Sequence, residues 1–130
     1  MGGLFAVAST EDCVSDLFFG TDYHTHLGTR RGGLAVMTEG RISRYIHDIS
    51  NAQFRSKFED DVQKMRGRQG IGVISDYEEQ PLIIGSHLGV YAIVTVGLVK
   101  NTDKLMAQAF QSRTHFSEMS GGEVNQTELI

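Results

Sequence analysis

Residues 26–36 read HLGTRRGGLAV, a glycine-rich turn that leads directly into a short apolar segment. The pair Gly32-Gly33 interrupts any helical pattern, and residues 34–37 then form an apolar run with the length of a buried strand. Glu39-Gly40 separates this run from residues 41–46. The sequence therefore predicts two adjacent antiparallel strands joined by a hairpin turn.

The N-terminal side of this segment predicts a strand followed by a helix. Residues 4–8 are apolar and precede a polar cluster, which is typical of a buried strand. Ser9 and Thr10 are candidate N-caps, and residues 13, 14, 17 and 18 then recur at helical spacing. This helix can run past Gly20 toward His26.

The C-terminal side alternates helices and strands. Residues 52–65 predict an amphipathic helix with Phe54, Phe58, Val62 and Met65 on its apolar side, and with residues 59–61 as a solvated acidic face. Strands are predicted at 71–74, 82–84 and 90–96. Residues 101–103 cap a helix whose apolar side carries residues 105, 106, 109 and 110, and residues 125–130 begin a last helix. This order predicts an α+β layered fold.

Composition limits the function classes. The 130 residues carry a formal net charge of -4 and contain one cysteine. One domain, with no nucleic-acid or membrane partner and no metal or cofactor site, is therefore expected. A reducing cytoplasm fits the single cysteine.

Several segments, taken in order, resemble the glutaminase domain of amidophosphoribosyltransferases, the enzymes that open purine synthesis. They are residues 2–6, 20–36, 70–72, 80–82, 91–97, 101 and 127–130, so the resemblance covers essentially the whole chain. It implies a class II glutamine amidotransferase domain with the N-terminal-nucleophile hydrolase fold, a four-layer αββα sandwich. Residues 1–130 would be its N-terminal part, incomplete after Ile130. A downstream phosphoribosyltransferase domain and a homo-oligomer are also implied.

The same resemblance implies that the catalytic residues are missing. In this family an N-terminal cysteine supplies the thiolate that attacks glutamine and the α-amine that handles the proton. Here Gly2 stands at that position, so removal of Met1 would leave a base without a nucleophile. Cys13 is expected to be a buried structural residue on the helix that follows.

Other positions of the family's site also differ. The His-Arg-Gly turn becomes His26-Leu27-Gly28, and an expected arginine is Ser75. The oxyanion asparagine becomes Val96, although Gly97 keeps a backbone donor, and Gln126 replaces the aspartate that holds the substrate's amino group. Loss of one oxyanion donor alone costs about 10²–10³ in rate.

We therefore expect no catalytic residue, a vestigial pocket at Gly2, His26, Gly97 and Gln126, and no metal ligands. His24 and His26 are expected to be structural. Arg30 and Arg31 are the candidate anion-binding residues, with a solvated or ion-paired surface pair as the alternative.

Three functions remain open. The favoured one is an amidotransferase-like pseudoenzyme domain without glutaminase activity, which serves structure, assembly or regulation. The second is a working glutamine-dependent enzyme with a rearranged site. The third is a module in which the emptied pocket binds another small metabolite.

Overall fold

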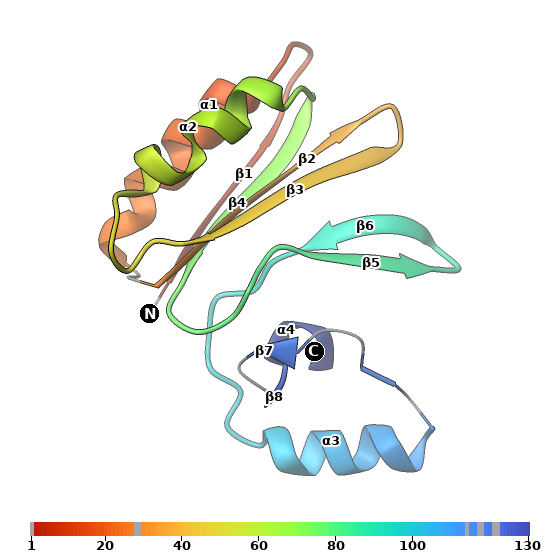
Figure 1. Cartoon of the computed structure of the whole chain (residues 1–130). Coiled ribbons are helices and arrows are strands. Elements are labelled where there is room, and N and C mark those ends of the chain that lie inside the picture. The colour runs from red at the N-terminus through yellow and green to blue at the C-terminus, as the bar shows by residue number, and fades with distance from the viewer. Residues whose placement is uncertain (1, 28–29, 114, 117–118, 121–122) are drawn as a thin grey trace.

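The computed structural model describes residues 2–27, 30–113, 115–116, 119–120 and 123–130. Met1 and Gly28, which enter the predictions above, lie outside these residues. The elements in chain order are β1 (Gly3–Ala8), α1 (Val14–Asp22), the 3₁₀ helix η1 (Tyr23–Leu27), β2 (Arg31–Thr38), β3 (Arg41–Asp48), α2 (Phe54–Lys64), β4 (Gln69–Ser75), β5 (Leu82–Ser86), β6 (Gly89–Ile93), α3 (Thr102–Gln111), β7 (Met119–Ser120), β8 (Glu123–Val124) and α4 (Gln126–Leu129). The predicted α+β class is confirmed (Figure 1).

The main sheet is antiparallel, with strand order β1-β4-β2-β3. β2 and β3 form the predicted hairpin, with Glu39 and Gly40 at positive φ in its turn. β4 returns from α2 and enters between β1 and β2, with Gly3 opposite Ile74 and Gly33 opposite Val73. This insertion places the N-terminus beside the end of β4.

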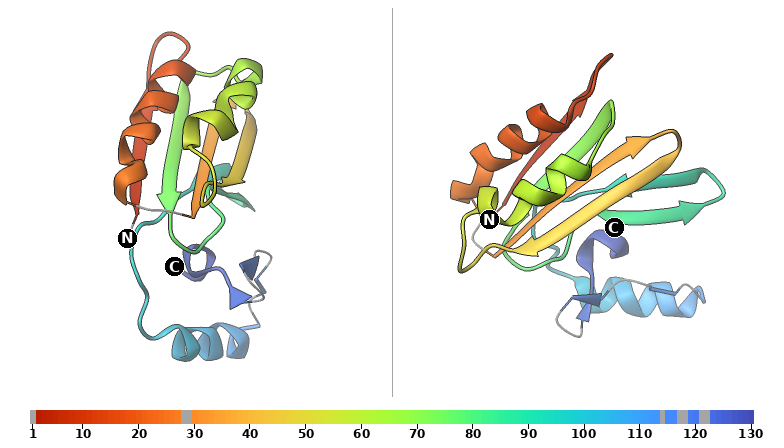
Figure 2. Two further views of the ribbon diagram at one scale, coloured as in Figure 1. Left: turned by 60° about the vertical axis from the view of Figure 1, so that its left-hand side comes forward. Right: turned by 45° about the horizontal axis from the view of Figure 1, so that its top comes forward.

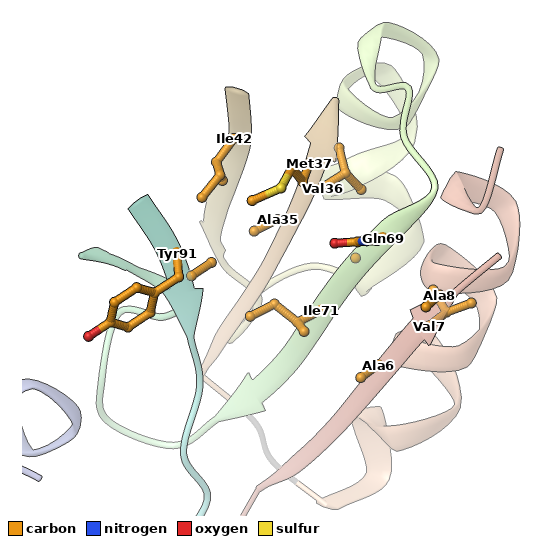
Figure 3. Close-up of a pocket in the computed structure, with 12 residues that line it drawn as sticks. Ala6, Val7, Ala8, Ala35, Val36, Met37, Ile42, Gln69, Ile71 and Tyr91 are labelled. Carbon is orange, nitrogen blue, oxygen red and sulfur yellow. The ribbon is translucent and has the colours of Figure 1, made fainter. Parts of the chain in front are cut away.

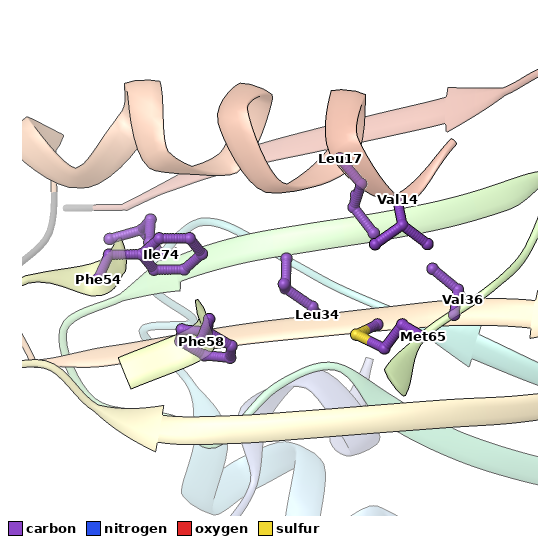
Figure 4. Close-up of a cluster of buried hydrophobic side chains, with 8 residues drawn as sticks. All are labelled: Val14, Leu17, Leu34, Val36, Phe54, Phe58, Met65 and Ile74. Atoms are coloured by element: carbon purple, nitrogen blue, oxygen red, sulfur yellow. The ribbon is translucent and has the colours of Figure 1, made fainter. Parts of the chain in front are cut away.

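Helices α1 and α2 cover one face of this sheet (Figure 2). The core between them contains Val14, Leu17, Leu34, Val36, Phe54, Phe58, Met65 and Ile74 (Figure 4). Phe54 and Phe58 stack with ring centroids 4.4 Å apart. On the sheet side, Gly70 and Gly72 of β4 leave room for α1, since a Cβ at Gly70 would lie 2.7 Å from the Leu17 side chain. Burial of the Val, Leu, Phe and Met side chains provides the main driving force for this layer.

The β5–β6 hairpin lies on the opposite side of the sheet from α1 and α2 (Figure 2). It is attached through Leu82, which is fully buried, and through the Arg44 guanidinium, which donates to the Pro81 carbonyl at 3.1 Å. The chain then continues to α3, to the short β7–β8 pair and to α4, which form the far end of the molecule (Figure 1). These layers are those expected of the predicted sandwich, with the second sheet represented here by two strands.

Several predicted boundaries need correction. α1 begins at Val14 with Cys13 at the N-cap, so Ser9 and Thr10 do not cap it; instead the Ser9 hydroxyl accepts from the Glu11 N–H. The continuation past Gly20 is confirmed, because η1 extends to Leu27. The strand predicted to reach residue 96 ends at Ile93. Since Gln80 offers its side-chain oxygen to the Thr95 N–H, the chain leaves the hairpin there.

The acidic face of α2 is also different from the prediction at one position. Glu59 and Asp60 are exposed, but the Asp61 carboxylate bonds the His47 ring, and only 14% of its side chain is exposed. The edge of the same imidazole packs on Phe58 at 4.7 Å between centroids. Asp61 therefore joins α2 to β3.

Candidate small-molecule site

A cavity of about 1070 Å³ opens at the end of the sheet where β1 starts and β4 stops. Its walls come from four places: the sheet end, the loop after β4, the loop after β6, and the segment around β8 and α4. The lining residues are Gly2, Arg30, Arg31, Asp48, Ser50, Ile74–Gln80 except Glu79, Thr95–Leu98, Glu123, Val124 and Gln126. Segments far apart in the sequence thus meet at one concave surface.

The last row of the sheet forms the first wall. Arg31 of β2 is opposite Asp48 on one side and Ser75 on the other, and the same register places Gly2 next to Ser75. The Arg31 guanidinium lies 3.6 Å from the Asp48 carboxylate and 4.0 Å from that of Glu79. Both contacts are therefore ion pairs and not hydrogen bonds, because their N···O distances are too long for a hydrogen bond.

Asp48 is held in its ionised form. The Ser50 hydroxyl and the Ser50 N–H, the latter at 2.8 Å, both donate to Asp48 Oδ1. These two bonds, with Arg31 and Lys57 adding charge, lower the pKa of the Asp48 carboxyl.

The loop after β4 forms the second wall. The Ser75 Oγ accepts from the N–H groups of Tyr77 and Glu78 at 3.3 and 3.2 Å, which fixes the turn. The Arg30 guanidinium lies over the Tyr77 ring, 5.9 Å from its centroid. This is a cation–π distance.

Glu78 ties this loop to α4. One of its carboxylate oxygens accepts from the Gln126 N–H; the other accepts from the Thr127 hydroxyl at 2.8 Å and from the Gln80 amide at 3.1 Å. Thr127 also bonds Thr95, hydroxyl to hydroxyl, at 2.6 Å. The buried polar side chains Gln80, Asn125 and Thr127 are therefore parts of one network that joins the loop after β4 to α4.

The structure brings five of the predicted site residues together. Gly2, Gly97, Gln126, Arg30 and Arg31 all line the cavity. His26 is not among the described lining residues; it is exposed in η1, where its Nδ1 pairs with the Tyr23 carbonyl at 2.8 Å. Of the replaced positions, Ser75 and Val96 line the cavity, whereas Leu27 lies in η1 with 36% of its surface exposed.

Two observations describe what the predicted positions can do. A Cβ built on Gly2 would overlap the carbonyl oxygen of Ile74 and lie 3.4 Å from its carbon. The side-chain oxygen of Gln126 already accepts from the Val99 N–H at 3.1 Å. Position 2 thus has no room for a side chain, and Gln126 is used within the protein.

Glu78 and Thr95 were missed by the sequence analysis. Glu78 is one of two adjacent acids in a loop, and no motif separates it from its exposed neighbour Glu79. The contacts of both residues depend on Thr127 of α4, which lies 49 residues after Glu78 and 32 after Thr95. Sequence spacing carries no signal for such a contact.

Cys13 lies away from this cavity. Its side chain is fully buried, as predicted, and burial, with Asp12 adding in the same direction, raises the pKa of the thiol. Among the described residues no group of three His, Cys, Asp or Glu side chains could hold a metal ion. In the same part of the chain no helix is long and apolar enough to cross a membrane.

A second, apolar cavity of about 410 Å³ lies between the open face of the sheet and β6 (Figure 3). Ala6, Ala35, Ile71 and Ile42 come from the four strands of the sheet, and Tyr91 comes from the hairpin. Its lining offers no ionisable group except the Tyr91 phenol. This second cavity is therefore much less polar than the first.

This fold is that of amidophosphoribosyltransferase structures, as the sequence resemblance predicted. One such structure is described as the allosteric regulatory enzyme of purine biosynthesis; its TM-score is 0.76 at 18% identity, over 90% of this chain and 26% of that one. Another is the glutamine phosphoribosylpyrophosphate amidotransferase of B. subtilis complexed with ADP and GMP, with a TM-score of 0.76 at 19% identity, over 99% of this chain and 28% of that one. No protein-family model and no curated protein matches the chain. The chain thus spans about a quarter of the length of these structures and shares their fold.

Proposed function

We propose that this chain is a glutamine amidotransferase-like domain of an amidophosphoribosyltransferase-related protein, which has lost glutaminase activity and acts structurally or in regulation. The structural similarity supports the amidotransferase-like domain and the link to purine biosynthesis. In this proposal residues 1–130 are the N-terminal part of a domain of the N-terminal-nucleophile type. A phosphoribosyltransferase domain, a homo-oligomer and a cytoplasmic location belong to the same proposal.

The observation that carries the proposal is that position 2 has no side chain and is closely packed against the Ile74 carbonyl. Nucleophilic attack on an amide needs a thiol or hydroxyl on a side chain, and a base to take its proton. Gly2 has no such group, and the Ile74 carbonyl occupies the place where a Cβ would start. The loss at position 2 is therefore matched by the packing around it.

The neighbouring positions support the same conclusion. Val96 lines the cavity with an alkyl side chain and cannot donate a hydrogen bond to an oxyanion. Cys13 is buried with a raised pKa, so little thiolate forms there. Neither Val96 nor Cys13 therefore offers a group that could replace the missing nucleophile.

A glutaminase assay on the full chain tests the proposal. We expect glutamate release from glutamine to equal the buffer blank for the unaltered protein and for the Cys13→Ala variant. The Gly2→Cys variant, with Met1 removed, should also stay at the blank, because a Cβ at position 2 meets the Ile74 carbonyl and because Val96 and Gln126 stand where the family has the oxyanion asparagine and the substrate-anchoring aspartate. Release above the blank that persists in Cys13→Ala would overturn the proposal in favour of a working, rearranged enzyme.

A second candidate is a small-metabolite binding module. The observation that favours it is the open cavity, which keeps about 1070 Å³ and a polar lining although the nucleophile is gone. A pocket that had only decayed would be filled by apolar side chains or collapsed. Saturable binding of a small molecule that is lost on mutation of lining residues tests this candidate.

A further inference from the structure

The charged side chains around the cavity differ in whether they have partners within the protein. Its lining contains two guanidinium and four carboxylate groups: Arg30, Arg31, Asp48, Asp76, Glu78 and Glu123. The Glu78 carboxylate accepts three hydrogen bonds, Asp48 is bonded by Ser50 and lies near Arg31, and Asp76 is engaged as well. Three of the four carboxylates therefore already have partners within the protein.

Arg30 is in the opposite situation. Its guanidinium contacts the Tyr77 ring, and no carboxylate of the described residues forms an ion pair with it. Arg30 is exposed at the mouth of the cavity, where a ligand can reach it. An unpaired guanidinium with five N–H donors is suited to a carboxylate or a phosphate.

Two more donors lie beside it. The contacts of Arg31 with Asp48 and Glu79, at 3.6 and 4.0 Å, are too long to use its N–H groups fully. Ser75, opposite Arg31 in the sheet, accepts two N–H groups and keeps its own hydroxyl proton to donate. Arg30 precedes Arg31 in the chain, Ser75 is opposite Arg31 in the sheet, and all three donors line the cavity.

The same cavity is also lined by large exposed apolar side chains. Tyr77 is 73% exposed, Leu98 70% and Val96 43%, and all three line the cavity. Exposed apolar groups next to unpaired donors mark ligand and partner sites on protein surfaces. The Tyr77 ring, which supports Arg30 on one face, adds an aromatic surface.

We propose that this mouth binds an amphipathic small molecule whose oxyanion head, a carboxylate or a phosphate, lies at Arg30, Arg31 and Ser75. Its apolar or aromatic body lies along Tyr77, Val96 and Leu98. The proposal gives a ligand class to the small-metabolite function above and rests on that function. It does not depend on the absence of glutaminase activity.

Titration calorimetry with four probes tests this site: phenyl phosphate, benzoate, inorganic phosphate and phenol. We expect saturable binding of phenyl phosphate or benzoate, tighter than that of phenol. Preference for phenyl phosphate identifies a phosphate head, and preference for benzoate a carboxylate; either supports the site. The Arg30→Gln variant should weaken the preferred probe by about tenfold or more, in line with a charge-assisted hydrogen bond.

Two further variants make the test specific. Arg41→Gln removes an exposed arginine at the start of β3, which does not line the cavity, and should leave all affinities unchanged. Tyr77→Ala should weaken the phenyl probe but not inorganic phosphate. Equal affinities in Arg30→Gln and Arg41→Gln, or no saturable binding of either anionic phenyl probe, would overturn the site. The glutaminase assay is scored separately: a blank there, together with no saturable binding here, overturns this site and leaves the proposed lack of glutaminase activity standing.

Discussion

Single glycines decide where backbones meet in this protein. Gly33 of β2 lies against the loop before β5, and a Cβ there would overlap the Gln80 carbonyl oxygen and lie 2.7 Å from Pro81. Gly85 of β5 has nothing within 4 Å of the same position. A methyl group would therefore clash at Gly33 but would find open space at Gly85.

Gly33→Ala should destabilise the fold by about 1–3 kcal/mol or more, because the loop carrying Gln80 must move away from the sheet. Urea unfolding followed by circular dichroism measures the difference. Gly85→Ala serves as the matched control and should change the free energy of unfolding by less than about 0.5 kcal/mol. Equal losses in both variants would mean that the approach at Gly33 is not tight.

Asp48 gives a pH-dependent prediction. Its pKa is lowered first by the Ser50 hydroxyl, so Ser50→Ala should raise the Asp48 pKa toward its ordinary value. A lowered carboxyl pKa stabilises the folded state above the pKa of the unfolded chain, and this stability is lost as the pH falls through the folded pKa. The variant should therefore be less stable than the parent at neutral pH, and the gap should narrow in acid.

NMR titration of the Asp48 carboxyl carbon measures the pKa directly, with Ser43→Ala, an exposed change on the same strand, as the control. An unchanged Asp48 pKa in Ser50→Ala would contradict the assignment of the hydroxyl as its main cause.

At the scale of elements, local periodicity predicted most of the fold. The strands at residues 4–8, 34–37, 41–46, 71–74 and 82–84 and the helices after residues 13 and 52 are present, because apolar repeats report burial directly. The helix after residue 101 is present as well, although none of its residues is buried. The errors lie where tertiary contacts compete. The sequence predicted that Asp61 is solvated like Glu59 and Asp60, but the His47 ring of β3 bonds its carboxylate. The β7–β8 pair was not predicted, since two-residue strands carry no periodicity.

The candidate site, too, was predicted in part, and the residues that were missed are those defined by tertiary contacts. The family resemblance found Gly2, Gly97 and Gln126, and composition drew attention to Arg30 and Arg31; all five line one cavity. Neither could find Glu78, because its partners Gln126 and Thr127 meet it only in the folded chain.

The Glu78 network predicts how α4 is held. Glu78→Gln replaces one acceptor oxygen by a donor NH₂ group that faces other donors, so α4 should loosen by about 1–3 kcal/mol. Hydrogen exchange of the Thr127 and Leu129 amides should accelerate. Glu59→Gln on the exposed side of α2 is the control and should leave these rates unchanged. Unaltered exchange in Glu78→Gln would show that α4 is held by other contacts.

At the scale of the whole molecule, burial is concentrated at the α1, α2 and four-stranded sheet layers. α1 buries Val14, Leu17 and Thr21, whereas α3 has no buried residue. The end of the molecule formed by α3 should therefore open at lower free energy than α1.

Native-state hydrogen exchange tests this gradient without any mutation. Amides in α3 should exchange at least about tenfold faster than those of α1 with similar intrinsic rates, since weakly packed elements open first. Equal protection of the two helices would show that the molecule unfolds as one cooperative unit.

The packing at Gly2 also bears on how the chain can change over generations. A mutation that restored cysteine at this position would first meet the Ile74 carbonyl, so its immediate effect would be a structural defect. Val96 would still offer no donor to an oxyanion, and so no catalytic benefit would offset that defect. Selection acts on single steps, and each single step back is unfavourable. Under the proposed function, a stepwise return to a cysteine nucleophile at position 2 is therefore unfavourable at each single step.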